Sequence, residues 1–156
     1  MLTADTVRFI EGGCALIVGG VHPDGSPYAT RGWGAQVLDP ERGRLRLLLS
    51  SLDDTAAELL RDGRPIAITG ADVPTLRSMQ LKGTASAIEP GTDEDRARSA
   101  AYQEAFFRDI EQTDGTPYEV VHLVRPPDVI ACLLEVREGF DQTPGPGAGG
   151  PLVRPS

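Results

Sequence analysis

The chain has 156 residues, of which 40% are hydrophobic and 24% are charged, so it is long enough for one domain with its own hydrophobic core. Its net charge of -8 repels a nucleic-acid backbone. No apolar stretch approaches the roughly 20 residues that span a bilayer, and the first residues lack the basic start and apolar run of a signal peptide. We therefore expect a cytoplasmic protein with neither a nucleic-acid nor a membrane partner.

Turn-forming residues divide the chain into short elements. Thr3 is suited to cap a first helix that Gly12 and Gly13 end, and Ser51 is suited to cap a second helix. The turn formers at residues 22–27 predict the tip of a hairpin. The expected helices cover about residues 3–12, 52–62 and 92–115, and the expected strands cover about residues 14–18, 28–38, 44–50, 65–71, 76–88, 118–124 and 129–137.

Six or seven short strands with two or three helices predict a mainly β fold with some α structure. Successive strands joined by turns favour a meander, and we expect it to close into a small antiparallel barrel with helices packed at its ends. Residues 1–140 hold all of these elements, whereas residues 141–156 contain too much Pro and Gly for a helix or an interior strand.

The strand predicted at residues 76–88 carries an unusual row of polar side chains. Alternation places one set of residues on the core side, namely Met79, Leu81 and Ala85, and another on the opposite side, namely Ser78, Gln80, Lys82 and Thr84. Gly83 leaves room for close approach by another backbone or by a flat ligand. Arg77, at the start of the strand, and Arg31, close to Trp33, are each either solvated, paired with an acidic residue, or available to bind an anion.

Other residues that often carry chemistry show no recognisable pattern. Cys14 and Cys132 lie in apolar strand-like runs and are expected to be buried thiols, and nothing in their spacing supports a disulfide. His22 falls in the predicted hairpin tip and His122 in a predicted strand, so the spacing predicts no metal site. There is no catalytic triad, phosphate-binding loop or dinucleotide fingerprint, and no catalytic residue is identified.

The order of these elements resembles a known family. The segments DGSPYAT, GRPIAIT and RSMQLKGTA, separated by a leucine-rich strand and a helix, are similar to the pyridoxamine 5'-phosphate oxidase-like proteins, the flavin split-barrel family. The likeness covers about residues 3–140 and is strongest at residues 77–83. It implies a six- to seven-stranded antiparallel split β-barrel with flanking helices in a flavin split-barrel domain of residues 1–140. It also implies a homodimer with a flavin, usually FMN, in a cleft between the subunits. Residues 140–149 are similar to the tail of a subgroup of unstated function.

The resemblance also implies which residues bind the cofactor. They are Arg31, Trp33, Ser50, Ser51, Arg77, Ser78 and Lys82, with Gln80 at the ligand or at the dimer contact. The family places a basic pair for the phosphate just after the serines, where this chain has Asp53 and Asp54. Two carboxylates repel a phosphate, although the free N–H groups of a helix start favour an anion; the acids are otherwise well placed in a first helical turn.

Three functions follow from this interpretation. The first is an FMN-dependent oxidoreductase that transfers hydride to or from an unknown small-molecule substrate. The second is a non-catalytic protein that binds flavin, deazaflavin or haem. The third is a cofactor-free dimeric interaction module.

Overall fold

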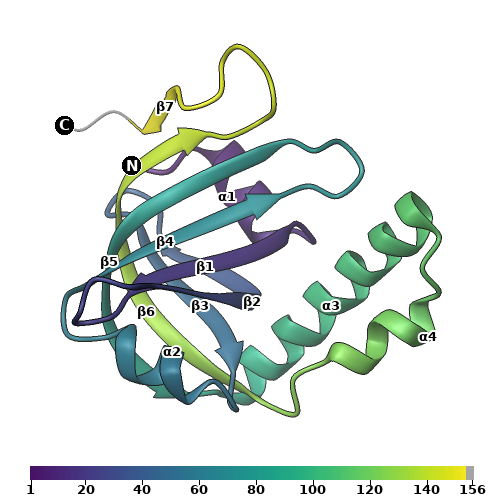
Figure 1. Ribbon diagram of the computed structural model, residues 1–156, viewed down its shortest axis with the longest axis horizontal. Helices are drawn as coiled ribbons and strands as arrows, with labels where there is room; N and C mark the ends of the chain where they lie inside the picture. The colour runs from purple at the N-terminus through teal and green to yellow at the C-terminus, as the bar shows by residue number, and fades with distance from the viewer. Residues whose placement is uncertain (154–156) are drawn as a thin grey trace.

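A seven-stranded antiparallel sheet closes into a barrel in the computed structural model, which describes residues 1–153. The strands follow the order β3-β2-β1-β4-β5-β6-β7, and β3 also pairs with β6, so the first six strands form a closed ring (Figure 1). The strands are β1 (Ala15–Val21), β2 (Pro27–Asp39), β3 (Arg44–Ser50), β4 (Arg64–Ala71), β5 (Ser78–Pro90), β6 (Val129–Asp141) and β7 (Pro151–Val153). The predicted antiparallel barrel is confirmed.

The barrel interior is filled by the alternating apolar residues that the sequence predicted. Leu45, Leu47 and Leu49 of β3 are fully buried, and Met79 and Leu81 of β5 are at most 2% exposed. Because side chains alternate between the faces of a strand, the same pattern turns Ser78, Gln80, Lys82 and Thr84 outward. The outer face of the barrel is therefore where polar and ligand-binding groups are available.

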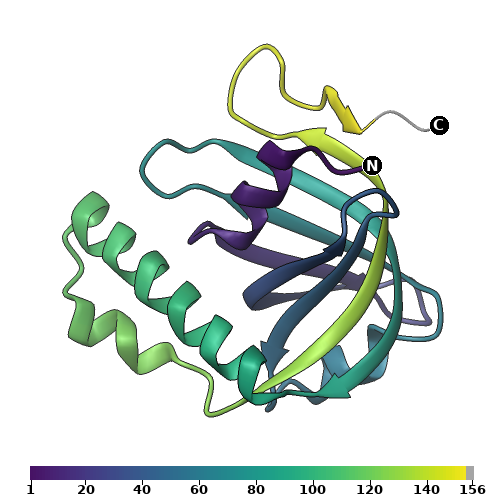
Figure 2. The ribbon, with the colours of Figure 1, turned by 180° about the vertical axis from the view of Figure 1, so that it is seen from behind.

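Four helices cover the ends and one side of the barrel, namely α1 (Ala4–Glu11), α2 (Asp54–Leu59), α3 (Asp93–Asp114) and α4 (Tyr118–Val121). Figures 1 and 2 show α1 and α2 at opposite ends and the long α3 at the side, followed by α4. The side chain of Thr3 accepts a hydrogen bond from the Thr6 amide, as its predicted role as N-cap requires. The N-cap of α2 is Asp53, whose carboxylate accepts from the Ala56 amide, so the prediction of Ser51 as the cap is wrong.

Residues 118–124 are helical, and the strand predicted there is wrong. They form α4 followed by the 3-10 turn η1 (His122–Val124). Only Val121 of this segment is buried, and pairing of β3 with β6 closes the barrel without it. The Tyr118 ring instead packs edge-on against Phe107 of α3, with the ring centroids 6.2 Å apart. An apolar segment with no free strand edge to join has therefore folded against the neighbouring helix.

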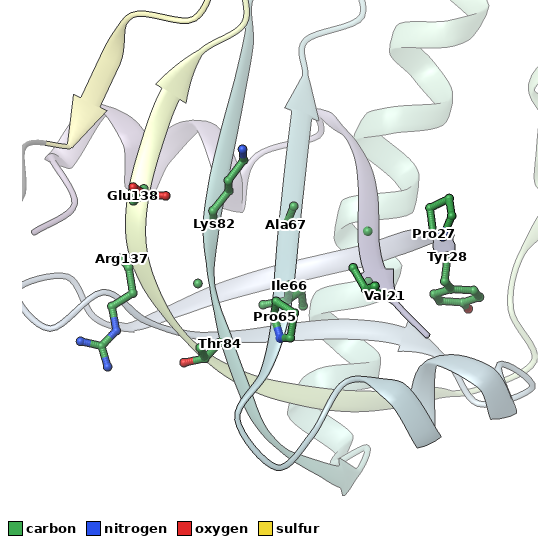
Figure 3. A pocket seen from close by; sticks show the side chains of 13 residues that line it. Val21, Pro27, Tyr28, Pro65, Ile66, Ala67, Lys82, Thr84, Arg137 and Glu138 are labelled. Atoms are coloured by element: carbon green, nitrogen blue, oxygen red, sulfur yellow. The ribbon is translucent and has the colours of Figure 1, made fainter. Parts of the chain in front are cut away.

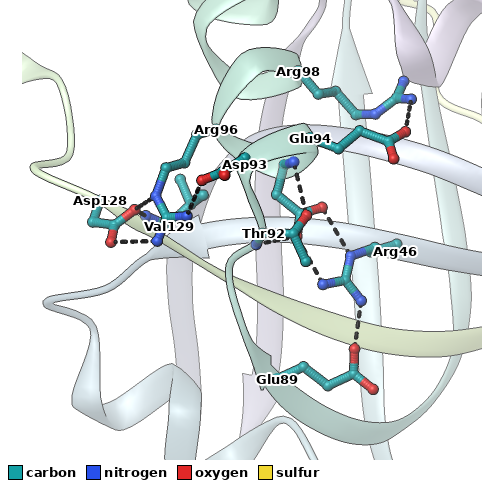
Figure 4. A network of polar contacts seen from close by, with 10 residues as sticks. Arg46, Glu89, Thr92, Asp93, Glu94, Arg96, Arg98, Asp128 and Val129 are labelled. Atoms are coloured by element: carbon teal, nitrogen blue, oxygen red, sulfur yellow. Dashed lines mark hydrogen bonds and ion pairs between the residues drawn. The ribbon is translucent and has the colours of Figure 1, made fainter.

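A buried ionic network fixes the start of α3 to the barrel wall (Figure 4). Arg46 of β3 donates two hydrogen bonds to Asp95, at 2.8 and 2.7 Å, and a third, at 2.5 Å, to Glu89 of β5. Asp95 is 3% exposed and also accepts from the Thr92 amide and hydroxyl. The hydrogen bonds from Arg46 outweigh burial and lower the pKa of Asp95 to about 2. The predicted start of the helix is confirmed, and its acidic residues also connect it to the sheet.

No helix within residues 1–153 is both long and apolar enough to cross a membrane. The last residues of the predicted C-terminal tail, 154–156, lie outside the described part of the chain. Within that part, residues 142–150 lead from β6 to the short edge strand β7, which pairs with Gly139 and Phe140.

Candidate functional site

A cavity of about 500 Å³ lies on the outer face of the sheet, and we call it the outer cavity. Its walls come from β1, β4, β5 and the two strands that flank them (Figure 3). Gly19, Ala67 and Lys82 occupy matching positions on three neighbouring strands, so the floor carries very small side chains next to one cation. The lining residues are Gly19, Gly20, Val21, Pro27, Tyr28, Pro65, Ile66, Ala67, Lys82, Gly83, Thr84, Arg137 and Glu138. A broad, shallow and mostly apolar hollow of this size fits a flat organic molecule.

The two ends of the outer cavity differ in polarity. Pro27 and Tyr28 lie at one end, whereas Lys82, Arg137 and Glu138 lie on β5 and β6 at the other (Figure 3). Lys82 forms no ion pair within the described residues, and its ammonium lies 5.1 Å from the centroid of the Phe140 ring. Arg137 forms only an exposed pair with Glu135, at 3.2 Å. The charged end therefore has an uncommitted cation beside an apolar floor.

Arg31 and Trp33 lie on β2, beside α3. The Arg31 guanidinium stacks over Phe106 at 4.9 Å and over Trp33 at 5.7 Å, and it forms no ion pair within residues 1–153. Trp33 is 6% exposed and belongs to the core. Arg31 pairs with Ile17, which pairs with Thr69, which pairs with Gln80. Arg31 thus shares the outer face with Lys82 but is separated from its strand by three strand spacings, roughly 14 Å.

Ser50 and Ser51 lie where β3 ends, close to an internal carboxylate. Asp53 accepts hydrogen bonds from the hydroxyls of Tyr28 and Thr30 and, at 2.9 Å, from the Ala56 amide. Burial alone would raise the pKa of Asp53, but these three hydrogen bonds outweigh it and lower the pKa below its ordinary value. Burial and the neighbouring carboxylate raise the pKa of Tyr28 to about 12. Asp54 lies in the first turn of α2, as predicted, whereas Asp53 is the N-cap, and its carboxylate occupies the donors that an anion would need.

Ser78 begins β5 and Arg77 directly precedes it, and both residues contact other parts of the chain. The Arg77 guanidinium pairs with Asp5 of α1 and stacks over Phe9 at 4.9 Å. The Ser78 hydroxyl donates to the carbonyl of Leu76 at 2.9 Å, and its backbone N–H donates to the Thr143 hydroxyl. Of the alternatives open for Arg77, the structure shows pairing with an acidic residue. Gln80 donates to Thr69 at 3.0 Å and so connects β5 to β4 on the outer face.

The predicted site residues are therefore spread over separate parts of this chain and do not form one site. Lys82 is the one that lines the outer cavity, while the others lie beside α3, at the start of α2 and next to α1. The floor residues Gly19 and Ala67, and Arg137 at the rim, were missed. The sequence feature that could have indicated them is a row of small residues on the outward face of strands 15–21 and 64–71. That row is recognisable only when the pairing of the two strands is known.

The outer cavity suits the ring of a flavin, whereas the start of α2 does not suit the phosphate of FMN. A flat apolar floor suits a planar ring, and Lys82 suits an anionic group. At the start of α2, however, Asp53 adds a negative charge where the phosphate of FMN was expected, and residues 50–54 include no basic residue. FMN in the position implied by the resemblance does not fit the described residues.

The structure confirms that both cysteines are buried thiols, and it places His22 at the hairpin turn and His122 in a 3-10 turn instead of the predicted strand. Cys14 and Cys132 are free and buried, and burial is the main cause that raises the pKa of each thiol to about 12. No cluster of three or more metal-ligating side chains occurs in residues 1–153. His22 contacts Tyr28 edge-on, with ring centroids 6.0 Å apart, and His122 lies in η1 against Tyr118.

Comparisons with known proteins extend the assignment of the fold. No protein-family model matches the sequence, and the search of curated proteins finds no match either. Among solved structures, HupZ of Group A Streptococcus superposes with a TM-score of 0.56 at 19% identity, covering 96% of this chain and 100% of that one. A single-substitution variant of HupZ gives 0.55 at 18% identity, covering 90% and 99% of the two chains. A candidate pyridoxamine 5'-phosphate oxidase of Lactobacillus delbrueckii gives 0.54 at 20% identity, covering 89% and 93%. The chain therefore has the split-barrel fold of the pyridoxamine 5'-phosphate oxidase-like proteins, as the sequence resemblance predicted.

Proposed function

We propose that this chain binds a flat organic anion in the outer cavity, with flavins as the leading class and deazaflavin and haem as the alternatives. The observation that supports it is the combination of an apolar floor at Gly19 and Ala67 with Lys82, which forms no ion pair within the described residues even though Glu138 is its neighbour across β5 and β6. Lys82 neutralises the anionic group, and the small floor residues allow a ring to lie flat on the sheet. Arg137 adds a second positive charge at the same end.

This arrangement differs from the FMN site that the resemblance implies. The phosphate is held by Lys82 on β5 and not by the start of α2, because Asp53 already takes the hydroxyls and the amide there. Six predicted cofactor-binding residues do not line the outer cavity, and their role stays a prediction: Arg31, Trp33, Ser50, Ser51, Arg77 and Ser78.

Titration with FMN and riboflavin, followed by quenching of flavin fluorescence, tests the proposal. We expect saturable binding, about tenfold tighter for FMN than for riboflavin at low salt, because a charge-assisted contact to the phosphate is worth about 1.5 kcal/mol or more. Lys82→Gln should abolish that difference, and Arg42→Gln, which removes an exposed arginine outside the outer cavity, should preserve it. Absence of saturable binding by FMN, a deazaflavin and haemin would leave the cofactor-free interaction module.

A second variant separates the two positions of the phosphate. Asp53→Asn removes the negative charge at the start of α2. If Lys82 holds the phosphate, Asp53→Asn leaves the affinity for FMN unchanged; a rise in that affinity would place the phosphate at α2 and refute the position proposed here.

We further propose that a homodimer covers the outer cavity. Ile17 and Val21 are 45% and 39% exposed, and both point outward from β1 beside the cavity floor. Exposed apolar residues that surround a ligand site are typical of a surface covered by a partner. Light scattering should give twice the chain mass for the wild type and the chain mass for Ile17→Lys. A monomeric wild type would refute the dimer.

The oxidoreductase activity is the finer part of the proposal. A bound flavin supplies hydride chemistry, and the chain supplies binding, orientation and exclusion of water. Bleaching of the visible flavin absorbance by NADH or NADPH, with recovery on adding an acceptor, would identify an enzyme. Stable flavin absorbance under the same conditions would identify a binding protein.

A further inference from the structure

A second cavity, of about 390 Å³, lies between α3 and the segment that leads from η1 into β6, and we call it the side cavity. It shares no lining residue with the outer cavity. Its walls are Arg96, Ser99, Ala100, Gln103, Arg125, Pro126, Pro127, Asp128 and Val129. The two prolines give one wall a rigid, flat and apolar surface.

Two buried polar side chains of α3, Ser99 and Gln103, line this cavity, and each has a hydrogen-bonding group that is not used within the described residues. Ser99 is 2% exposed and Gln103 is 7% exposed. The Gln103 side-chain nitrogen Nε2 donates to the Ser99 hydroxyl at 3.0 Å. The Gln103 side-chain oxygen Oε1 accepts no hydrogen bond within residues 1–153. The Ser99 hydroxyl likewise donates to no described residue. The unpaired Gln103 oxygen is not among the fully buried atoms, of which only Arg98 Nε lacks a partner in residues 1–153, so a ligand in the cavity can reach that oxygen.

The charged residues that line the side cavity are Arg96, Arg125 and Asp128, with Asp93 beside Arg96 and Glu104 near Arg125. Asp128 is neutralised by Arg96, which donates to it through two nitrogens at 2.9 and 3.0 Å. Arg125 forms no ion pair within the described residues. Its guanidinium stacks 5.8 Å above the Phe107 ring and donates to the Tyr118 hydroxyl at 2.7 Å. These contacts hold the cation at the wall and leave further N–H groups free, since guanidinium has five donors.

The wall that carries Arg125 is fixed at both of its ends. The Arg125 amide donates to the carbonyl of His122, and the Ser51 amide donates to the carbonyl of Asp128 at 2.9 Å. Figure 4 shows Arg96 between Asp93 and Asp128, joining the start of α3 to the start of β6. A cavity with fixed walls needs little reorganisation to bind a ligand.

We propose that the side cavity binds a small organic carboxylate that carries a hydroxyl group. Arg125 binds the carboxylate, Ser99 and Gln103 bind the hydroxyl, and Pro126, Pro127 and Ala100 cover the apolar part. This site is independent of the flavin proposal, because the two cavities have no residue in common.

The test uses para-hydroxybenzoate and its uncharged amide, para-hydroxybenzamide, titrated into the ¹⁵N-labelled full chain. We expect saturable shifts of the amides of Ser99, Ala100, Gln103 and Val129 with the acid, and affinity at least about tenfold weaker for the amide. Arg125→Gln should weaken binding of the acid by a similar factor. Arg108→Gln is the matched control, because Arg108, like Arg125, contacts Tyr118, in its case by stacking over the ring at 5.7 Å, but does not line the cavity.

Several outcomes would overturn the proposal. Absence of saturable shifts in the millimolar range, equal affinity for acid and amide, or shifts confined to other parts of the chain would each do so. Equal weakening by Arg125→Gln and Arg108→Gln would show a general charge effect and would also refute the site. If Arg125→Gln fails to fold, the affinities of the wild-type chain for the acid and for the amide still test whether the cavity binds a carboxylate.

Discussion

Replacing Asp95 by Asn tests whether the buried ionic network holds α3 on the barrel. Asp95 receives two hydrogen bonds from Arg46 and accepts from the Thr92 amide and hydroxyl. The substitution keeps the shape of the side chain but removes its charge, which leaves the 13% exposed Arg46 side chain with Glu89 as its remaining partner. Removing one member of a buried pair costs about 3–5 kcal/mol, and the contact with Glu89 places the expected loss near about 3 kcal/mol.

The same pair predicts a dependence on pH. The pKa of Asp95 falls from 3.8 to about 2 on folding, so the folded state favours the charged carboxylate. Stability from this group is fully present above pH about 4 and is lost as the pH falls toward about 2. Because a tenfold change in proton affinity corresponds to about 1.4 kcal/mol, the loss of stability amounts to about 2 kcal/mol.

Urea unfolding followed by circular dichroism measures both effects. With an m-value of about 2 kcal/mol/M, a loss of about 3 kcal/mol lowers the urea midpoint at neutral pH by about 1.5 M. Asp95→Asn should also lose about 2 kcal/mol of the wild-type decline in stability between pH about 4 and 2, and the other carboxylates with lowered pKa, such as Asp53, account for the rest. The control is Asp93→Asn in the same helical turn, whose side chain is fully exposed and which should shift the midpoint little. Equal midpoints for wild type and Asp95→Asn at neutral pH would refute the role assigned to this network.

Two further predictions concern the core and the sheet. Cys14 and Cys132 should resist an aromatic disulfide reagent at pH about 8 in the native protein and react after unfolding in urea, because both thiols are buried with pKa values of about 12; rapid reaction of either thiol in the native state would contradict this. Gly83→Ala should lower the thermal midpoint and cost about 2 kcal/mol or more, because a Cβ atom there overlaps the carbonyl oxygen of Glu135 across the β5–β6 register shift. Gly147→Ala is its control, because no atom lies within 4 Å of the added carbon. Equal thermal midpoints for the two variants would contradict the prediction, since they would show that β6 shifts to accept the added carbon with no loss of stability.

Much of the fold was predictable because its signals are local. The leucines of β3 alternate, Thr3 and Thr92 cap helices, and the turn at residues 22–27 joins two strands, all within a few neighbouring residues. The prediction of a strand at residues 118–124 was wrong because its outcome depends on contacts between distant segments. The apolar composition of residues 118–124 suits a strand, but the pairing of β3 with β6 closes the six-stranded ring and leaves no place in it for another strand.

The candidate sites depended on contacts between distant segments. From sequence, Arg77 was equally able to bind a ligand or an acidic residue, and only the packing of α1 beside β5 brings Asp5 to it. Likewise, Asp53 became an internal anion because β2 brings Tyr28 and Thr30 to the start of α2.

By itself, the sequence determined the barrel, its outward polar row on β5 and the mismatch between Asp53 and a phosphate, since side-chain alternation and charge are properties of short segments. Only the tertiary structure decided which cations are already paired and which cavities exist. The floor of the outer cavity combines residues 19, 67 and 82, and the side cavity combines α3 with the segment before β6. Such surfaces arise from strand register and helix packing, which act between residues far apart in the chain.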